Sequence, residues 1–588
     1  MSKPYVYRKL DPKRLEIRLL KVLPDEAEKP VRVIVRMVQL PAVYETISYA
    51  WGDPARSCEI VVRLNKRRRW SRQLRVPVNT QAALRRMRYS DRACTIWIDA
   101  VCINQDDKVE RSQQVAIMGK IFASSFGNLV YLGELEDADM AAHIQSTIDN
   151  LLLHAKYETN NFRTFDSTVF DEAYRSQLER QGLPFEVDKD LVGLVLRLPW
   201  FRRLWVLQEA VMAPNSTAFL GSLQLDLHDM LHAFIWWERH LTSYPSGTTQ
   251  GVQCLITTYF ALFQPGGSRA ASTQPLANLL ITANDFQKSE PRDGVYALIS
   301  MMDERSSSAL SPDYTKPLSE VLQSASRLAI EQDPFILTEI AHRPGDLERA
   351  EVASWAMRVD REMDWDIDPK PIERPDSGLY TISKRPDNTS GGWKPRVLNL
   401  QGHRADIVSI VTPLCARSIH GDAGAFLVWL WGAVELYTSV SGPSSREAKA
   451  TTFAKTLCAD DYWRRQYHEL EDEKRNPIER LLAALGAAET EDILEHFEAS
   501  YAFTPGFWNS ILNRRCFVTQ QGRLGLGPLD TQPGDVVAML SGTSNPFILR
   551  PLDGGQYQLV GASYVDGIMP EQLDDEWESK EPEVFALV

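Results

Sequence analysis

Polar side chains that could hold a ligand follow a short apolar run in the first third of the chain. Residues 94–98 read Cys-Thr-Ile-Trp-Ile, which is typical of a buried strand, and Asp99, Asn104 and Gln105 come soon after it. In open α/β sheets, ligands bind beyond the carboxyl ends of the strands, so these three side chains are candidates to line a site. The alternative is that Asp99 caps the turn after the strand, as aspartates there commonly do.

A second apolar run ends in the same way. Residues 44–50 read Tyr-Glu-Thr-Ile-Ser-Tyr-Ala and are followed by Trp51 and Gly52. Gly52 would permit a tight turn, and Ser48 would lie at the same sheet edge as Asp99. Trp51 could stack on a nucleotide base, although core packing is the favoured interpretation. Ser48, Trp51 and Gly52 are therefore further candidates for contacts with a ligand.

Several kinds of chemistry lack their usual motifs. The seven cysteines are widely spaced without a CxxC pair, and the ten histidines include no HExxH pair, so the sequence predicts no metal site. Cys102 has no signature of a nucleophile and is favoured as a small buried hydrophobe. No GxGxxG or Walker sequence is present, which argues against a dehydrogenase of the Rossmann type and against a P-loop ATPase.

The spacing of apolar residues predicts three regions. Strands alternate with helices over residues 1–220, which indicates a doubly wound, mainly parallel α/β sheet with 96–98 and 129–132 as neighbouring central strands. Residues 221–500 are mostly helical in pattern. Residues 501–588 contain short apolar runs separated by glycine-rich turns, which predicts a small β-barrel or sandwich.

Three segments of the first region resemble the heterokaryon-incompatibility (HET) family of fungal proteins. They are the strand ending in Ser48-Tyr49-Ala50-Trp51-Gly52, the stretch from Trp97 to Gln105, and the stretch from Leu198 to Glu209. Residues 291–298, 312–314, 522–528 and 534–537 also resemble segments found in these proteins. The resemblance covers most of the chain. It implies a protein of fungal non-self recognition whose HET domain triggers programmed cell death.

HET domains in turn resemble TIR domains, which implies a flavodoxin-like sheet and a candidate catalytic residue. Several TIR domains cleave NAD with a helix glutamate in a Trp-Cys-x-x-Glu pattern. Here Trp205 and Glu209 keep the spacing, but Val206 replaces the cysteine. By this resemblance Glu209 is the catalytic candidate, and Arg202 and Trp205 are candidates for nucleotide contacts. The alternative is a structural glutamate that pairs with Arg202, Arg203 or the basic stretch described below.

A single carboxylate would suit cleavage of NAD at the N-ribosyl bond. Nicotinamide leaves as a neutral molecule from a cationic ring, so its departure needs no general acid. One carboxylate that stabilises the developing oxocarbenium ion could suffice, in contrast to the paired acids of ordinary glycosidases. NAD or a related nucleotide would be the substrate of such an NAD glycohydrolase, and no cofactor is implied.

Charge is distributed unevenly. Residues 63–92 hold eleven basic residues and one acidic residue, in a chain of net charge −13. We favour contacts of this basic stretch with acidic parts of the same chain or with dinucleotide phosphates. Nucleic acid is disfavoured because few aromatic residues accompany the run and the rest of the chain is acidic.

The remaining features favour a cytoplasmic protein. Apolar residues make up 44% of the 588 residues, which is ordinary for globular chains, and the first residues lack the apolar run of a signal peptide. The longest apolar stretch is too short to span a membrane. Two functions stay open: a nucleotide-cleaving enzyme, or a non-catalytic module that self-associates through its HET domain and recruits a cell-death effector. The incompatibility partner is not indicated by the sequence.

Overall fold

A computed structural model describes most of the chain and divides it into two compact units. The described residues are 3–63, 71–161, 188–240, 274–349, 351–362, 396–416, 510–569 and 581–588, with isolated positions at 255–259, 425–436 and 456–457. One unit comprises residues 1–316 and 360–362, and the other comprises 317–359 and 363–588. The first unit thus continues beyond residue 220. The three-domain division at 220 and 500 stays a prediction.

The first unit is built around a nine-stranded sheet with the order β5-β4-β2-β1-β6-β3-β7-β8-β9 among the described residues. The strands are β1 (Glu16–Val22), β2 (Arg32–Gln39), β3 (Glu45–Tyr49), β4 (Cys58–Arg63), β5 (Ser71–Val76), β6 (Cys94–Trp97), β7 (Gly127–Gly133), β8 (Ser216–Leu220) and β9 (Leu223–Asp226).

The sheet is mixed, so the expectation of a mainly parallel sheet is not confirmed: the parallel pairs are those of its centre and β2–β4. Strands β6, β3, β7 and β8 run parallel. The pairs β1–β2, β1–β6, β4–β5 and β8–β9 are antiparallel. Short links such as the two residues between β8 and β9 allow only a hairpin, because a parallel connection needs a long crossover. Antiparallel strands therefore extend the parallel core on both sides.

The predicted strands at 96–98 and 129–132 both exist, but they are not neighbours. Strand β3 lies between β6 and β7 and pairs with both. The prediction of direct pairing was therefore wrong. The carboxyl end of β3, which carries Ser48, consequently lies between the ends of the two other strands.

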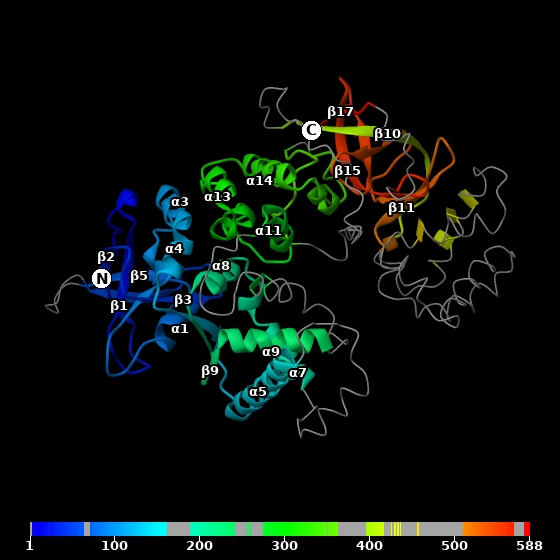
Figure 1. The fold of residues 1–588 in the computed structure, drawn as a ribbon. Coiled ribbons are helices and arrows are strands. Elements are labelled where there is room, and N and C mark those ends of the chain that lie inside the picture. Colours follow the sequence, from blue (N-terminus) through cyan, green and yellow to red (C-terminus); the bar gives the residue numbers. More distant parts are fainter. Residues whose placement is uncertain are drawn as a thin grey trace. The chain divides into compact units, whose positions relative to one another are not determined.

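Helices cover the sheet, and Figure 1 shows α3, α4 and α8 on one side of it and α1 on the other. Two of these helices, α3 and α4, meet at Ile117. The helices of this unit are α1 (Val78–Arg86), α2 (Asp99–Cys102), α3 (Lys108–Ala116), α4 (Met118–Ala123), α5 (Ala138–Asn161), α7 (Lys189–Leu196), α8 (Trp205–Met212), α9 (Leu227–His240), α11 (Leu276–Ala283), α12 (Asp293–Tyr296) and α13 (Glu304–Ala309). Short 3₁₀ turns lie at Pro12–Arg14 (η1), Pro199–Arg202 (η2) and Ile299–Met301 (η3).

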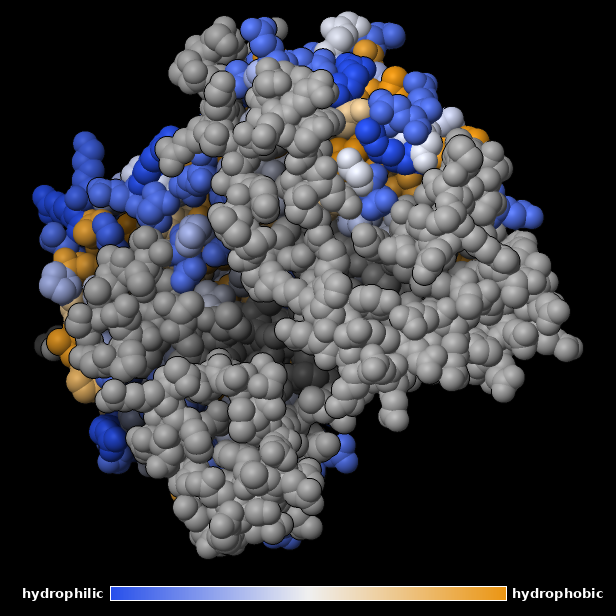
Figure 2. All heavy atoms as spheres, turned by 45° about the vertical axis from the view of Figure 1, so that its right-hand side comes forward, coloured by the Kyte–Doolittle hydropathy of each residue, from blue (hydrophilic) through white to orange (hydrophobic). Residues whose placement is uncertain are grey.

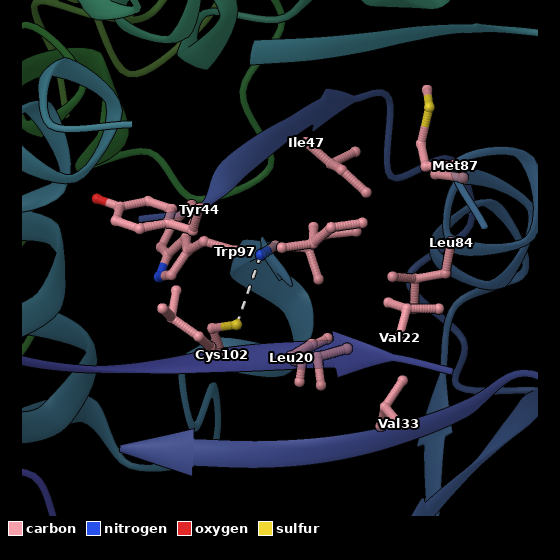
Figure 3. Close-up of a cluster of buried hydrophobic side chains, with 14 of the residues drawn as sticks. Leu20, Val22, Val33, Tyr44, Ile47, Leu84, Met87, Trp97 and Cys102 are labelled. Atoms are coloured by element: carbon pink, nitrogen blue, oxygen red, sulfur yellow. Dashed lines mark hydrogen bonds between the residues drawn. The ribbon is translucent and has the colours of Figure 1, made fainter. Parts of the chain in front are cut away.

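The core of the first unit lies between the sheet and these helices. Figure 3 shows the Trp97 side chain beside Tyr44, whereas Ile47 points toward Leu84 of α1. All four side chains are buried. Burial of this apolar surface stabilises the strands whose ends carry the candidate residues.

The second unit contains a small β-barrel. A barrel was one of the two forms expected from the sequence, the other being a sandwich. Strands β13, β14, β15, β17 and β10 pair in this order, and β10 also pairs with β13, which closes a ring. The strands are β10 (Leu398–Val411), β11 (Arg514–Thr519), β12 (Leu524–Pro528), β13 (Val536–Leu540), β14 (Pro546–Pro551), β15 (Gln556–Ala562), β16 (Tyr564–Val565) and β17 (Glu583–Leu587). Helix α14 (Leu318–Gln332) and the 3₁₀ turn η4 (Pro334–Glu339) belong to the same unit.

The described surface mixes hydrophilic and hydrophobic residues, as one face shows in Figure 2. Several large apolar side chains are exposed, among them Val43 and Phe126 of the first unit and Val428 of the second. Scattered exposure of this kind is ordinary for globular proteins. Among the residues that the structure describes, no helix has the length and apolarity needed to cross a bilayer.

Candidate functional site

Glu209 lies at the centre of a buried hydrogen-bonded group beside the end of β3. Its helix, α8, packs against β3, and its side chain is only 4% exposed. The Ser48 hydroxyl of β3 donates to Oε2 of Glu209. Trp200 in η2 donates its indole N–H to the same hydroxyl at 2.7 Å. Trp200, Ser48 and Glu209 thus form one chain of hydrogen bonds.

The surroundings of Glu209 favour its neutral form. Burial raises the pKa of this carboxyl to about 7, the nearby Asp99 adds to the increase, and Arg203 and the Ser48 hydroxyl oppose it. A carboxyl with a pKa near neutrality can both hold and release a proton at physiological pH. Carboxyls with shifted pKa values cluster at functional sites, although buried structural groups also show such shifts.

Asp99 lies at the start of α2, directly after β6, and is half-buried. Its Oδ2 accepts the indole N–H of Trp51 at 2.9 Å, and its Oδ1 accepts the backbone N–H of Ala100 at 2.6 Å. Burial raises the pKa of Asp99, and the Arg203 guanidinium opposes this increase. The carboxylate therefore holds both the local turn and Trp51.

Arg203 connects the two carboxyl groups electrostatically. It follows η2, and its guanidinium donates to the backbone carbonyl of Tyr49 at the end of β3. Its positive charge opposes the increase in the pKa of both Asp99 and Glu209. Two acids and one base thus share the carboxyl end of β3.

The turn after β3 requires glycine. Gly52 has a φ of +66°, and a Cβ there would approach Nδ2 of Asn79 to 2.7 Å. Asn79 donates to the carbonyl of Ala50 at 2.9 Å, so it is held in place. The expectation of a tight turn is thereby explained. Trp51 packs against the core while its N–H reaches Asp99.

The other residues that the sequence suggested as ligand contacts differ in their exposure and in their hydrogen-bond partners. Gln105 donates to the backbone carbonyl of Asp99 at 3.1 Å. Asn104 is half-buried, and its backbone N–H donates to Glu110 at 2.7 Å. Arg202 is exposed, whereas Trp205 is half-buried and donates to Asp293 at 2.9 Å. Ser48, Asp99, Trp51 and Glu209 therefore lie together, whereas Arg202 is not among the side chains that contact them.

Sequence reasoning missed several residues that complete this region. Asn128 of β7 is 1% exposed and donates to the Glu209 carbonyl and to Ser216, both at 3.3 Å. Trp200 lies within the motif that contains Glu209, so its position could have identified it, whereas Arg203 was expected only as a partner of a structural Glu209. Asp293 lies in the segment 291–298, whose resemblance was noted without a role being assigned.

Cys102 is a buried hydrophobe rather than a nucleophile. It is fully buried, and its Sγ accepts the backbone N–H of Ile98 at 3.5 Å. Burial raises the pKa of this thiol to about 12, so the reactive thiolate is absent at neutral pH. Over the described part of the chain, no group of histidines, cysteines or carboxylates is arranged to hold a metal ion.

Part of the basic stretch has a structural role. Arg88 is 8% exposed and donates to the carbonyls of Glu26, Ala27, Lys29 and Pro30. Arg86 donates to the Gly221 carbonyl at 3.1 Å and lies over the Phe219 ring. Lys66–Arg69 and the acidic residues 571–578 lie outside the described residues. Intramolecular contact, one of the two favoured roles, thus applies to these two arginines.

Comparison with known proteins identifies the regions that hold these features. Residues 44–209 match the family model described as heterokaryon incompatibility protein (HET). The chain carries a HET domain. Residues 441–588 match the Het-6 beta-barrel domain. Ser48, Asp99 and Glu209 all lie inside the HET match, whose last residue is Glu209.

The sequence of one related protein aligns with almost the whole chain. It is "Heterokaryon incompatibility protein 6, OR allele" of Neurospora crassa, which is 24% identical over 93% of this chain and 92% of the relative. No solved structure matches the chain. The HET domain expected from the three sequence motifs is thereby confirmed.

Proposed function

We propose that this HET protein acts in fungal non-self recognition and that its HET domain triggers cell death by cleaving NAD or a related nucleotide. The family match and the Neurospora relative support the role in incompatibility. The single observation that supports the catalytic step is the buried Glu209 carboxyl, whose pKa is raised to about 7 beside Asp99 and Arg203. The resemblance of HET domains to TIR domains points to the same residue.

The proposed reaction is hydrolysis. The bond between the nicotinamide nitrogen and ribose C1′ breaks, and nicotinamide leaves with the bonding electron pair. Ionised Glu209 stabilises the positive charge that develops on the ribose, and water then adds to C1′ and releases one proton. Electrostatic stabilisation by a fixed charged group is commonly the largest single contribution to catalysis.

A second candidate function rests on the enclosure of the same residue. Glu209 is 4% exposed and accepts the Ser48 hydroxyl, and a glutamate satisfied in this way can serve the fold alone. The HET domain would then be a non-catalytic module that self-associates and recruits a cell-death effector. The presence of Val206 where the TIR pattern has cysteine agrees with this alternative.

The test compares wild-type protein with Glu209→Gln. Purified full-length protein is incubated with NAD over a range of protein concentrations, and nicotinamide release is measured by chromatography. We expect release by wild type and a decrease of at least about 100-fold in Glu209→Gln, because removal of one electrostatic group in an active site typically costs that much. Glu134→Gln makes the same charge change at an exposed position and is the control.

Expression in a fungal cell separates the two functions. Killing that persists in Glu209→Gln at normal protein levels, together with no nicotinamide release by wild type, would support the assembly function instead. Loss of killing together with loss of cleavage supports the enzyme.

A further inference from the structure

Helix α8, which carries Glu209, begins without the usual side-chain cap. Leu204 precedes its first residue, and no side chain accepts a hydrogen bond from the first turn. Serine, threonine, aspartate or asparagine commonly fills this role and stabilises the start of the helix. The start of α8 therefore depends on contacts from outside the helix.

Those contacts come from residues 287–314, which follow the HET match in the sequence. The Leu204 N–H donates to the Gln287 carbonyl at 3.1 Å, and the Gln287 N–H donates to the Arg202 carbonyl at 2.6 Å. The Ser300 hydroxyl donates to Gln208 at 2.6 Å. This segment holds the first turn of α8, while Ser48 and Asn128 hold the helix to the sheet.

Asp293 is the centre of this arrangement. The residue is 4% exposed, and its Oδ2 accepts the Trp205 indole N–H at 2.9 Å. Its Oδ1 accepts the Tyr314 hydroxyl at 2.6 Å. Arg111 of α3 lies 3.6 Å from the same oxygen and 3.8 Å from the centre of the Tyr314 ring. One buried carboxylate thus connects α8, α3 and the loop that contains Tyr314.

The connection leads directly to Glu209. Trp205 and Glu209 are four residues apart, so their side chains lie one turn apart on the same side of α8. A shift of Trp205 would therefore move Glu209 relative to Ser48 and Arg203. A displacement of about 1 Å at a reacting group can reduce activity on the order of 100-fold.

We propose that Asp293 is a positioning residue that fixes helix α8 and so keeps Glu209 enclosed, which makes residues 287–314 part of the functional module. The effect on activity rests on the proposed function, but the effect on the enclosure of Glu209 does not. Asparagine at position 293 cannot replace the carboxylate, because its amide offers one oxygen for the two donors Trp205 and Tyr314.

The first measurement needs no catalytic activity. Infrared spectra of the full-length protein are recorded over pH 4 to 9, and the band of the protonated Glu209 carboxyl is isolated by subtracting the spectrum of Glu209→Gln. The same subtraction pairs Asp293→Asn with the double variant Asp293→Asn/Glu209→Gln. We expect the midpoint to fall by about one pH unit in Asp293→Asn, because a loosened α8 admits water to Glu209.

Two further variants keep the test decisive. Tyr314→Phe removes only one donor to Asp293 and should lower the midpoint in the same direction by a smaller amount, even if Asp293→Asn does not fold. Asp25→Asn removes a carboxylate that pairs with Arg32 between β1 and β2, and it should leave the midpoint unchanged. An unchanged midpoint in both Tyr314→Phe and folded Asp293→Asn would overturn the proposal.

Activity provides the second measurement. If wild type releases nicotinamide, Asp293→Asn should lower kcat about tenfold or more with KM nearly unchanged, and the pH profile should shift with the infrared midpoint. If wild type releases none, the proposed enzyme is wrong while the infrared midpoint still decides the role of Asp293. A shifted midpoint with full activity would overturn the positioning role.

Discussion

The carboxyl group of Glu209 is stabilised as the neutral acid by its enclosure between helix α8 and strand β3. Its pKa is about 7 in the folded protein, whereas an exposed glutamate has a pKa near 4.5. The folded state therefore binds this proton more tightly than the unfolded state does. The associated stability is fully present below pH 4.5 and is lost as the pH rises to about 7.

Glu209→Gln tests this dependence, because glutamine stays neutral at every pH. The unfolding temperature of the variant relative to wild type should rise between pH 4.5 and pH 7 and then level off. The shift in pKa corresponds to a change on the order of 3 kcal/mol. Scanning calorimetry from pH 4.5 to 8.5 measures the difference. A difference that falls with increasing pH would mean that Glu209 is ionised and stabilising in the fold.

Residue-level prediction from the sequence succeeded where a local rule applied. Ser48 and Asp99 were placed correctly at a common sheet edge because each follows or ends a recognisable strand. The group around Asp293 could not be predicted in the same way. Arg111 and Asp293 are 182 positions apart, and only the packing of the whole unit brings them within 3.6 Å.

At the scale of elements, the periodicity of apolar residues located the central strands but not their order. Strand β3 lies between β6 and β7 although it precedes both in the chain. The periodicity of a strand indicates which of its faces are buried, but it carries no information about the neighbour on either side. The antiparallel edges were missed because the overall alternation of strands and helices outweighed the local hairpins.

The basic helix α1 and the arginine that follows it contribute to the stability of the first unit. Arg88 follows α1 and holds the connection between β1 and β2 through four carbonyl groups, whereas Arg85 is exposed. Arg88→Ala should lower the stability of the first unit by roughly 2–4 kcal/mol, since it removes a buried guanidinium that donates to four carbonyl groups. Arg85→Ala, the matched control, should change stability by less than about 0.5 kcal/mol.

Thermal unfolding of both variants checks this expectation. NAD binding by the same variants distinguishes the two roles of the basic stretch, which are contacts within the chain and contacts with dinucleotide phosphates. Weaker binding in Arg85→Ala without loss of stability would show that the exposed arginines contact phosphate. Equal stability of the two variants would contradict the structural role of Arg88.

At the scale of the whole molecule, charge predicts how the HET protein meets nucleic acid. Residues 63–92 carry +10 and the whole chain carries −13, so the remainder carries −23. This excess of negative charge should repel a long polyanion. In a mobility-shift assay with a random DNA duplex, we expect no shift even at low salt. The opposite outcome is a shift that disappears at higher salt and also disappears when the basic residues of 63–92 are replaced with glutamine. That result would show that the basic stretch binds nucleic acid.

The ring of the C-terminal barrel has a consequence for how the protein is made. Strand β17 (583–587) pairs with both β10 and β15, although about 170 residues separate it from β10. The ring therefore stays open during synthesis until the ribosome has released residue 587, while the first unit already has all its strands. A message interrupted before codon 583 would yield a polypeptide with two unpaired strand edges, and such edges promote aggregation.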